Sequence, residues 1–152
     1  MREDPEWFQG TADAVYQNLR LIEKHAPDLI VVFSADHIYR MDVRQMVDFH
    51  LRSGADVTVA ALPVPIGEAS AFGIIDADAD GVIRSFREKP VDPAPMTNDP
   101  ARAFASMGNY IFNADVLSKA LKEGKRLGEK DFGKDMLPRL IKTKRVYAYD
   151  FG

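Results

Sequence analysis

The stretch Leu29-Ile30-Val31-Val32-Phe33-Ser34-Ala35-Asp36-His37-Ile38-Tyr39 decides the fold. Its first five residues are large and apolar, and three of them are β-branched, which is typical of a strand covered on both faces. We therefore expect a central parallel strand over residues 29–33. Ligands of open α/β sheets bind at the carboxyl ends of strands, so Asp36 is a candidate for a substrate or metal site. An Asp at a strand end also serves as a helix cap or turn residue, and the run alone leaves this alternative open.

The composition bounds the class of protein. The chain has 152 residues, of which 46% are hydrophobic, enough for one core in one domain or in part of a larger one. A net charge of −3 argues against a general nucleic-acid binder, and the absence of cysteine excludes disulfides, thiolate catalysis and zinc sites of the cysteine type. No apolar run approaches the roughly 20 residues of a membrane helix, and the N-terminus lacks a signal-peptide pattern. We expect a soluble, cytoplasmic protein that binds neither membrane nor nucleic acid.

Periodicity predicts alternating strands and helices. Apolar residues at helical spacing predict helices over 11–26, 42–53, 114–122 and from about 131 to 141, with Gly124 ending the third. Runs rich in β-branched and aromatic residues predict strands over 29–33, 56–62, 72–76, 82–87, 105–112 and 145–151. A helix between the first two strands predicts a right-handed parallel βαβ unit.

Two segments between these elements have their own signals. Pro63 and Pro65 are expected to break regular structure before a hairpin, and residues 91–102, with three prolines, are expected to form a mobile loop. Residues 76–81 imitate the start of a calcium-binding EF-hand loop. The position that would hold the bidentate Glu is Arg87 and the flanks are strand-like, so we interpret this segment as the hairpin turn.

Two short motifs admit both a binding and a structural interpretation. Gly10-Thr11 opens a predicted helix and could present backbone N–H groups to a phosphate or a base, although many helices begin this way and bind nothing. Glu88-Lys89-Pro90 closes the hairpin, and Pro90 is expected to force Lys89 into an extended conformation. An exposed ion pair is the alternative for Glu88 and Lys89.

Taken together, six motifs give the chain a family resemblance that extends along almost all of its length. They occur in the family's order, and the chain resembles the glucose-1-phosphate adenylyltransferases, or ADP-glucose pyrophosphorylases. The motifs are Trp7-Phe8-Gln9-Gly10-Thr11-Ala12-Asp13-Ala14, Ala35-Asp36-His37-Ile38-Tyr39, Ala69-Ser70-Ala71-Phe72-Gly73, Glu88-Lys89-Pro90, Ser106-Met107-Gly108 and Asp131-Phe132-Gly133-Lys134-Asp135.

The resemblance implies a reaction and a set of site residues. ATP and α-glucose 1-phosphate would give ADP-glucose and pyrophosphate with Mg²⁺, in the bacterial glycogen pathway. Asp36 matches the metal-ligating carboxylate, and Lys89 matches the lysine that holds the sugar phosphate; both are the expected catalytic residues. The other matched positions are Phe8, Gln9, Gly10, Thr11, Ala12 and Ala35 for the nucleotide, Gly73, Glu88 and Ser106 around the sugar, and Asp131 and Phe132 behind them.

The resemblance also implies a fold and a place within a longer protein. It implies an α/β, Rossmann-like nucleotidyltransferase with a mostly parallel mixed sheet and flanking helices, in which residues 1–152 form the central part of a catalytic domain truncated at both ends. The family's triphosphate loop, second metal-binding Asp and C-terminal β-helix are not in this sequence, so we expect a sheet edge to be exposed and the 152 residues alone to be inactive. The family's enzymes are expected to be homotetramers. Ala35 stands where the family usually has Gly.

Two other functions remain open at this point. One is a nucleotidyltransferase that uses another base or another sugar 1-phosphate, against which the motifs at Gly10 and Ser106 argue. The other is a non-catalytic module that binds nucleotide or sugar phosphate, which the missing triphosphate loop favours.

Overall fold

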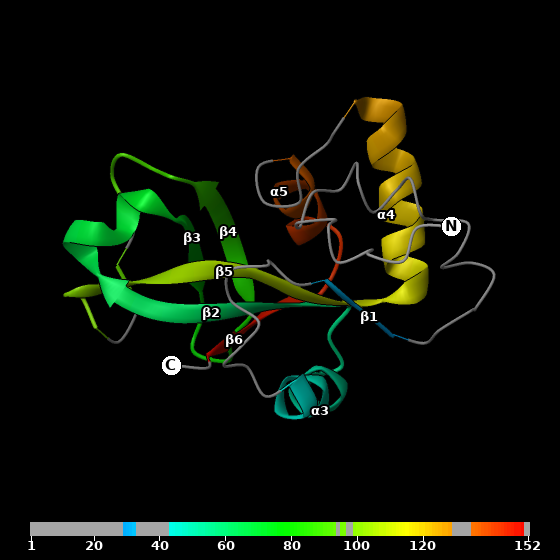
Figure 1. Ribbon diagram of the computed structural model, residues 1–152, viewed down its shortest axis with the longest axis horizontal. Helices are drawn as coiled ribbons and strands as arrows, with labels where there is room; N and C mark the ends of the chain where they lie inside the picture. The colour runs from blue at the N-terminus through cyan, green and yellow to red at the C-terminus, as the bar shows by residue number, and fades with distance from the viewer. Residues whose placement is uncertain (1–28, 33–42, 94, 97–98, 129–134, 151–152) are drawn as a thin grey trace, which may run out of the picture.

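The structure is a computed structural model that describes residues 29–32, 43–93, 95–96, 99–128 and 135–150. These residues form a six-stranded mixed sheet with helices packed on both faces (Figure 1). The elements are β1 (Leu29–Val32), α3 (Val43–Ser53), β2 (Val57–Pro65), η3 (Ile66–Ala71), β3 (Gly73–Ala77), β4 (Ile83–Glu88), β5 (Arg102–Asn113), α4 (Ala114–Leu127), α5 (Leu137–Ile141) and β6 (Val146–Asp150).

The long strand β5 is the spine of the sheet. The strands follow the order β4-β3-β5-β2-β6, and β1 pairs with β5 beside β3. β5 is antiparallel to β1, β2 and β3, whereas β2 and β6 are parallel. The predicted mixed α/β sheet with flanking helices is confirmed, but the expected mostly parallel pairing is not found among the described strands, where only β2 and β6 are parallel and the other four pairings are antiparallel.

The two faces of the sheet bury different helices. In Figure 1, α4 and α5 lie on one side of the sheet and α3 on the other. The larger core lies under α4 and α5 and includes Phe112, Leu117, Leu121 and Leu137. A smaller cluster forms where Met46 of α3 packs against the other face. In the described residues no helix is long and apolar enough to span a membrane.

β1 differs from the expected central strand. Leu29, Ile30 and Val31 are only half-buried, and Val32 is buried. Within the described residues β1 pairs with β5 alone, and the pairing is antiparallel. β1 and β2 do run in the same direction with α3 between them, but β5 separates them, so the predicted βαβ unit does not form an adjacent pair. A run of apolar residues indicates that a strand is buried, but it does not indicate which other strand pairs with it.

Prolines did not end β2 where they were expected to. The strand continues through Pro63 and Pro65, which pair with Phe104 and Arg102 of β5. The register with β6 covers only residues 57–61, so within the described residues the second edge of β2 is open beyond that point. A proline lacks the N–H donor, and a strand tolerates it where that donor would face an open edge.

Among the described residues, α3, α4 and α5 lie largely where periodicity predicts helices, with two corrections, and the helix expected over residues 11–26 lies outside the described residues. Met46 and Leu51 both fit the helical spacing that predicts a buried face, but only Met46 is buried. Leu51 is 62% exposed, and His50 is buried in its place with hydrogen bonds to Thr58 and Asn113. Gly124 does not end α4. It is buried inside the helix, which continues to Leu127 and is capped by Gly128 at φ +80°.

The hairpin is confirmed, and part of the expected loop over 91–102 is ordered by hydrogen bonds. β3 and β4 pair antiparallel over Gly73–Ala77 and Ile83–Glu88. In the loop, the Met96 N–H donates to the Arg102 carbonyl at 2.8 Å. The Asp99 carboxylate accepts bonds from the Arg102 guanidinium and the Ala101 N–H, which together hold the pKa of Asp99 below its usual value.

Candidate functional site

Three residues predicted to surround a sugar lie in one row across the sheet. Gly73 of β3 pairs with Glu88 of β4. On its other side, β3 pairs Ile74 with Ala105 of β5, and continuing this register by one residue sets Gly73 opposite Ser106. Side chains in one row of a sheet point to the same face. The structure therefore brings together residues that are up to 33 positions apart in the sequence.

Gly73, at the centre of this row, has no room for a side chain. We call the space above its Cα atom, where a Cβ atom would lie, the notch. A Cβ atom on Gly73 would lie 2.5 Å from Cζ of Phe86 and 3.1 Å from Oε1 of Glu88. Contacts below 3.0 Å essentially do not occur for real Cβ atoms, so any side chain at this position would displace its neighbours. Gly73 is required for space.

Lys89 follows the row and has an unusual backbone. Its φ is +44°, in the left-handed region, which corrects the expectation of an extended residue before Pro90. The Lys89 N–H donates to the Phe72 carbonyl at 3.1 Å and so continues the β3–β4 ladder, while Pro90 is buried. These tertiary contacts override the local preference of a residue before proline. A left-handed non-glycine residue costs about 1–3 kcal/mol, and residues strained in this way cluster at active and ligand-binding sites.

The side chains of Glu88 and Lys89 are both exposed. Within the described residues neither takes part in an ion pair, although four such pairs occur elsewhere on the surface. The exposed ion-pair interpretation of Glu88-Lys89 therefore has no support in the described structure. A carboxylate and an ammonium group thus lie exposed at the end of the row, and no other described residue pairs with their charges.

Ser106 lies beside a large bulge in β5. Val59 of β2 pairs with Tyr110, whereas Ala61 pairs with Ser106, so one residue of β2 faces three of β5. Gly108 lies within the bulge at φ +76°, and its N–H donates to the Ser106 hydroxyl at 3.3 Å. Bulges redirect side chains and are frequent beside active sites. The Ser106-Met107-Gly108 motif thus has a structural basis, since Gly108 supplies the conformation that the bulge needs.

The remaining predicted site residues lie outside the described residues. They are Phe8, Gln9, Gly10, Thr11, Ala12, Ala35, Asp36, Asp131 and Phe132. β1 ends at Val32, four positions before Asp36. In the described part of the chain no three His, Asp or Glu side chains gather in a way that could hold a metal ion.

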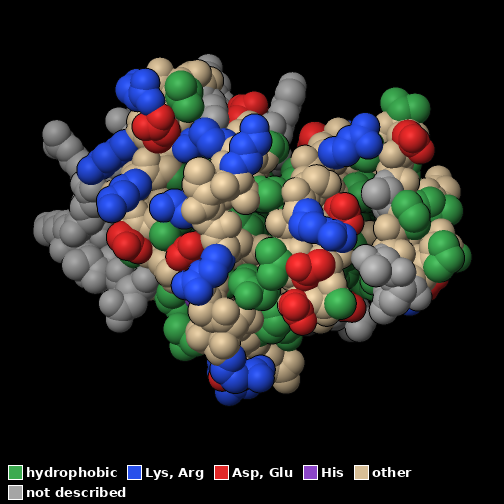
Figure 2. Space-filling model, turned by 180° about the vertical axis from the view of Figure 1, so that it is seen from behind, with side chains coloured by type: hydrophobic (Ala, Val, Ile, Leu, Met, Phe, Trp, Pro, Cys, Tyr) green, Lys and Arg blue, Asp and Glu red, His purple; other side chains and the backbone are tan. Residues whose placement is uncertain are grey.

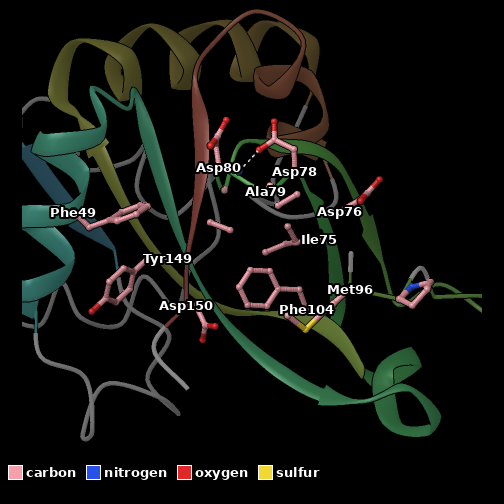
Figure 3. Close-up of a pocket in the computed structure, with 14 residues that line it drawn as sticks. Phe49, Ile75, Asp76, Asp78, Ala79, Asp80, Met96, Phe104, Tyr149 and Asp150 are labelled. Carbon is pink, nitrogen blue, oxygen red and sulfur yellow. Dashed lines mark hydrogen bonds between the residues drawn. The ribbon is translucent and has the colours of Figure 1, made fainter. Parts of the chain in front are cut away.

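A separate cavity of about 470 Å³ lies between the hairpin turn and the end of β6 (Figure 3). Ile75, Met96, Phe104 and Tyr149 are among its apolar lining residues, and none of the row residues lines it. Its carboxylates come from Asp76 of β3, from Asp78 and Asp80 of the hairpin turn and from Asp150 of β6. In Figure 3, Asp78 lies beside Asp80 and accepts the Asp80 N–H, so that carboxylate is engaged within the turn.

Charged side chains of both signs are interspersed over the face shown in Figure 2.

Two groups at the site were not predicted from the sequence. They are Phe86, whose ring fills the notch, and the Phe72 carbonyl, which accepts a hydrogen bond from the Lys89 N–H. Phe86 could have been found from its spacing, because it precedes Glu88 by two positions on a strand and shares its face.

Comparison with known proteins shows which family the chain resembles. The family model described as nucleotidyl transferase matches residues 1–151. The chain is 56% identical to a glucose-1-phosphate adenylyltransferase of Thermodesulfovibrio yellowstonii, over 99% of this chain and 37% of the relative. It is 50% identical to glucose-1-phosphate adenylyltransferase 1 of Vibrio cholerae, over 99% of this chain and 38% of that relative.

A similar protein from Thermus thermophilus, also a glucose-1-phosphate adenylyltransferase, is 48% identical over 97% of this chain and 36% of its own length. The chain thus spans little more than a third of the curated relatives that it matches. The family model covers almost every residue of it, including the whole row from Gly73 to Ser106. The chain belongs to the nucleotidyl transferase family.

Proposed function

We propose that residues 1–152 are the central part of the catalytic domain of a glucose-1-phosphate adenylyltransferase, which makes ADP-glucose and pyrophosphate from ATP and α-glucose 1-phosphate. The observation that carries the proposal is the row of Glu88, Gly73 and Ser106 with Lys89 directly after it. The relatives of that name match the chain over nearly its whole length. By the same resemblance, the parent enzyme is a cytoplasmic homotetramer of the glycogen pathway.

The row gives each described residue a role toward glucose 1-phosphate. The sugar ring lies beside the row, with the Glu88 carboxylate accepting hydrogen bonds from sugar hydroxyls and the Ser106 hydroxyl close by, while Gly73 itself is buried under the Phe86 ring. The Lys89 ammonium group binds the sugar phosphate. A compact ammonium group suits a phosphate, and a charge-assisted hydrogen bond is about twice as strong as a neutral one.

The reaction requires positioning and charge neutralisation. An oxygen of the sugar phosphate attacks the α-phosphorus of ATP, the new P–O bond forms in line, and the bond from the α-phosphorus to the pyrophosphate oxygen breaks. Lys89 keeps the attacking phosphate in place and offsets its negative charge. No protein nucleophile takes part.

Nucleotidyltransferases of this kind generally use a divalent metal ion. We assign Mg²⁺ and propose that the Asp36 carboxylate holds it beyond the end of β1, a carboxylate being the ligand type that Mg²⁺ prefers. Bound there, the metal would neutralise charge on the triphosphate. Residues Phe8, Gln9, Gly10, Thr11, Ala12 and Ala35 would contact the nucleotide, and Asp131 and Phe132 would lie behind the substrate-contacting residues.

The test is a hybrid enzyme in which residues 1–152 replace the matching segment of the Thermodesulfovibrio yellowstonii relative. We expect the hybrid to form ADP-glucose and pyrophosphate from ATP and glucose 1-phosphate. Asp36→Asn should lower its turnover by at least about a hundredfold, because an amide is a much poorer magnesium ligand than a carboxylate. Circular dichroism checks that the variant is folded. A folded hybrid that forms no ADP-glucose, or normal turnover in Asp36→Asn, would contradict the proposal.

A further inference from the structure

The Phe86 ring and the Glu88 carboxylate meet over Gly73. Phe86 and Glu88 are two positions apart on β4, so their side chains are on the same face, and Gly73 is the cross-strand partner of Glu88. Cζ and Cε1 of Phe86 lie 2.5 and 3.1 Å from the place of a Cβ on Gly73, and Oε1 of Glu88 lies 3.1 Å from the same point. Ring and carboxylate therefore share one small space.

Glycine at position 73 is needed for that space and not for its backbone. The four glycines with positive φ among the described residues are Gly54, Gly81, Gly108 and Gly128, and Gly73 is not one of them. An alanine could adopt the backbone conformation of Gly73, but its methyl group would overlap the Phe86 ring.

The ring has little freedom to move away. Phe86 is 7% exposed and belongs to the main hydrophobic core, together with Ile75, Ile83 and Leu137. Helix α5 packs against β4 at this place. Close-packed cores transmit a displacement instead of absorbing it. A shift of the ring is thus passed to the neighbouring carboxylate and to Lys89, the next residue.

We infer that Phe86 is a positioning residue for the sugar-phosphate end of the site. Its ring, seated in the notch of Gly73, fixes where the Glu88 carboxylate lies and the direction in which the chain enters Lys89. The inference rests on the proposed function and deepens it, because it assigns recognition of the sugar phosphate to a core side chain that itself stays out of reach of solvent.

The test is a double-mutant cycle of Gly73→Ala and Phe86→Leu in the hybrid enzyme, with steady-state kinetics on both substrates. Gly73→Ala alone should lower kcat/KM for glucose 1-phosphate by about 10- to 100-fold, since displacements near 1 Å have effects of this size. The KM for ATP should stay within about twofold. Phe86→Leu removes the ring atoms nearest the notch and should cost about three- to tenfold through loss of support for Glu88.

The decisive result is the double variant. If the ring is what Gly73 accommodates, Gly73→Ala should cost less than about twofold in the Phe86→Leu background. An equal cost of Gly73→Ala in both backgrounds would overturn the inference, because the added methyl group would then be acting on the substrate directly. An unchanged kcat/KM in Phe86→Leu would overturn it too.

Two controls separate this result from general effects. Ile83→Val truncates a core residue of the same strand at the far end of the hairpin, and it should lower the melting temperature while leaving kcat/KM for both substrates unchanged. The parent hybrid reports on the proposed function itself: without ADP-glucose formation there, the proposed function fails and not only the role of Phe86.

Gly73→Ala alone could fail to fold. In that case, a double variant that folds confirms the clash between the methyl group and the ring. The kinetic effect must then appear in Phe86→Leu and Phe86→Met, and if it does not, the inference is wrong.

Discussion

The two ends of the β3–β4 hairpin use similar residues in opposite ways. At the turn, the Asp78 carboxylate accepts the N–H groups of Asp80 and Val82 at 2.9 and 3.0 Å, and the positive φ of +91° falls on Gly81. At the open end, the charged groups of Glu88 and Lys89 are exposed, and the positive φ of +44° falls on Lys89.

The difference separates a structural end from a functional one. At the turn, the Asp78 carboxylate accepts hydrogen bonds from the turn itself, and the positive φ falls on Gly81, a residue type that tolerates it. Selection for stability alone would give this arrangement. The open end accepts strain in a lysine and leaves two charges without an ion pair in the described structure. Strain that persists against the local preference is a feature of ligand sites.

Within the hairpin, the largest expected effect is that of Lys89→Ala on glucose 1-phosphate. Loss of one charge-assisted phosphate contact should cost about 1.5–3 kcal/mol, or roughly 10- to 150-fold in the KM for glucose 1-phosphate. The KM for ATP should change by less than about twofold. Steady-state kinetics of the hybrid enzyme measure both constants.

Lys89→Arg is the matched variant for this effect. It should recover only part of the loss, because it keeps the charge but replaces the compact ammonium group with a planar guanidinium. Equal weakening toward both substrates in Lys89→Ala would instead assign Lys89 to the integrity of the domain, and no change would assign it to the bulk surface.

The turn end should respond in stability and not in affinity. Asp78→Ala removes the acceptor of two backbone N–H groups and should lower the free energy of unfolding by about 1–3 kcal/mol. The KM for glucose 1-phosphate should stay the same. Urea denaturation of the chain measures the first, and kinetics of the hybrid the second.

The neighbouring Asp80→Ala is the control, because within the described part of the chain Asp80 contributes its backbone N–H to the turn and not its carboxylate. It should change the free energy of unfolding by less than about 0.5 kcal/mol. Equal destabilisation by the two substitutions would show that the turn depends on charge and not on the hydrogen bonds of Asp78.

Gly81→Ala should destabilise the chain by about 1–2 kcal/mol, since an L-residue is disfavoured at positive φ. The new Cβ would also lie 3.4 Å from the Ala148 carbonyl of β6. Gly67→Ala is the matched control, because nothing lies within 4 Å of its Cβ position and its φ is not positive. Thermal unfolding compares the two, and an equal loss in both would remove backbone strain as the cause.

The smallest effect distinguishes strain from function at a single residue. Lys89→Gly relieves a left-handed residue at a gain of about 1–2 kcal/mol, less about 0.5–1 kcal/mol for the extra freedom of glycine in the unfolded chain. We expect a net stabilisation of up to about 1.5 kcal/mol by urea denaturation, accompanied by the affinity loss of Lys89→Ala. Destabilisation would mean that Lys89 contributes to folding.

Local sequence patterns predict where helices and strands lie along the chain better than they predict which strands pair with one another. The hairpin, α3 and β6 follow from periodicity, because each depends on residues close in sequence. The placement of β1 beside β5 could not be predicted, since it depends on pairing across some 80 positions. The sequence predicts a helix end at Gly124 and the structure has none there, because a glycine looks the same in sequence whether it caps a helix or lies buried within one.

The site shows the same division. The sequence motifs predict Gly73, Glu88, Lys89 and Ser106 as site residues. Only the register across three strands shows why Gly73, Glu88 and Ser106 lie together. The left-handed backbone of Lys89 runs against the local rule for a residue before proline, and it follows from the hydrogen bond to Phe72 and the burial of Pro90. No local pattern contains that information.

The most direct test is a crystal structure of the hybrid enzyme with glucose 1-phosphate. We predict the sugar phosphate within about 3 Å of Nζ of Lys89, a hydrogen-bond distance, with the sugar ring beside Glu88 and a hydroxyl donating to the Glu88 carboxylate. Lys89 should keep its positive φ in the complex. Density for the sugar phosphate in the cavity beside the hairpin turn, or a complex in which Lys89 does not touch the phosphate, would contradict the assignment of the open end as the functional one.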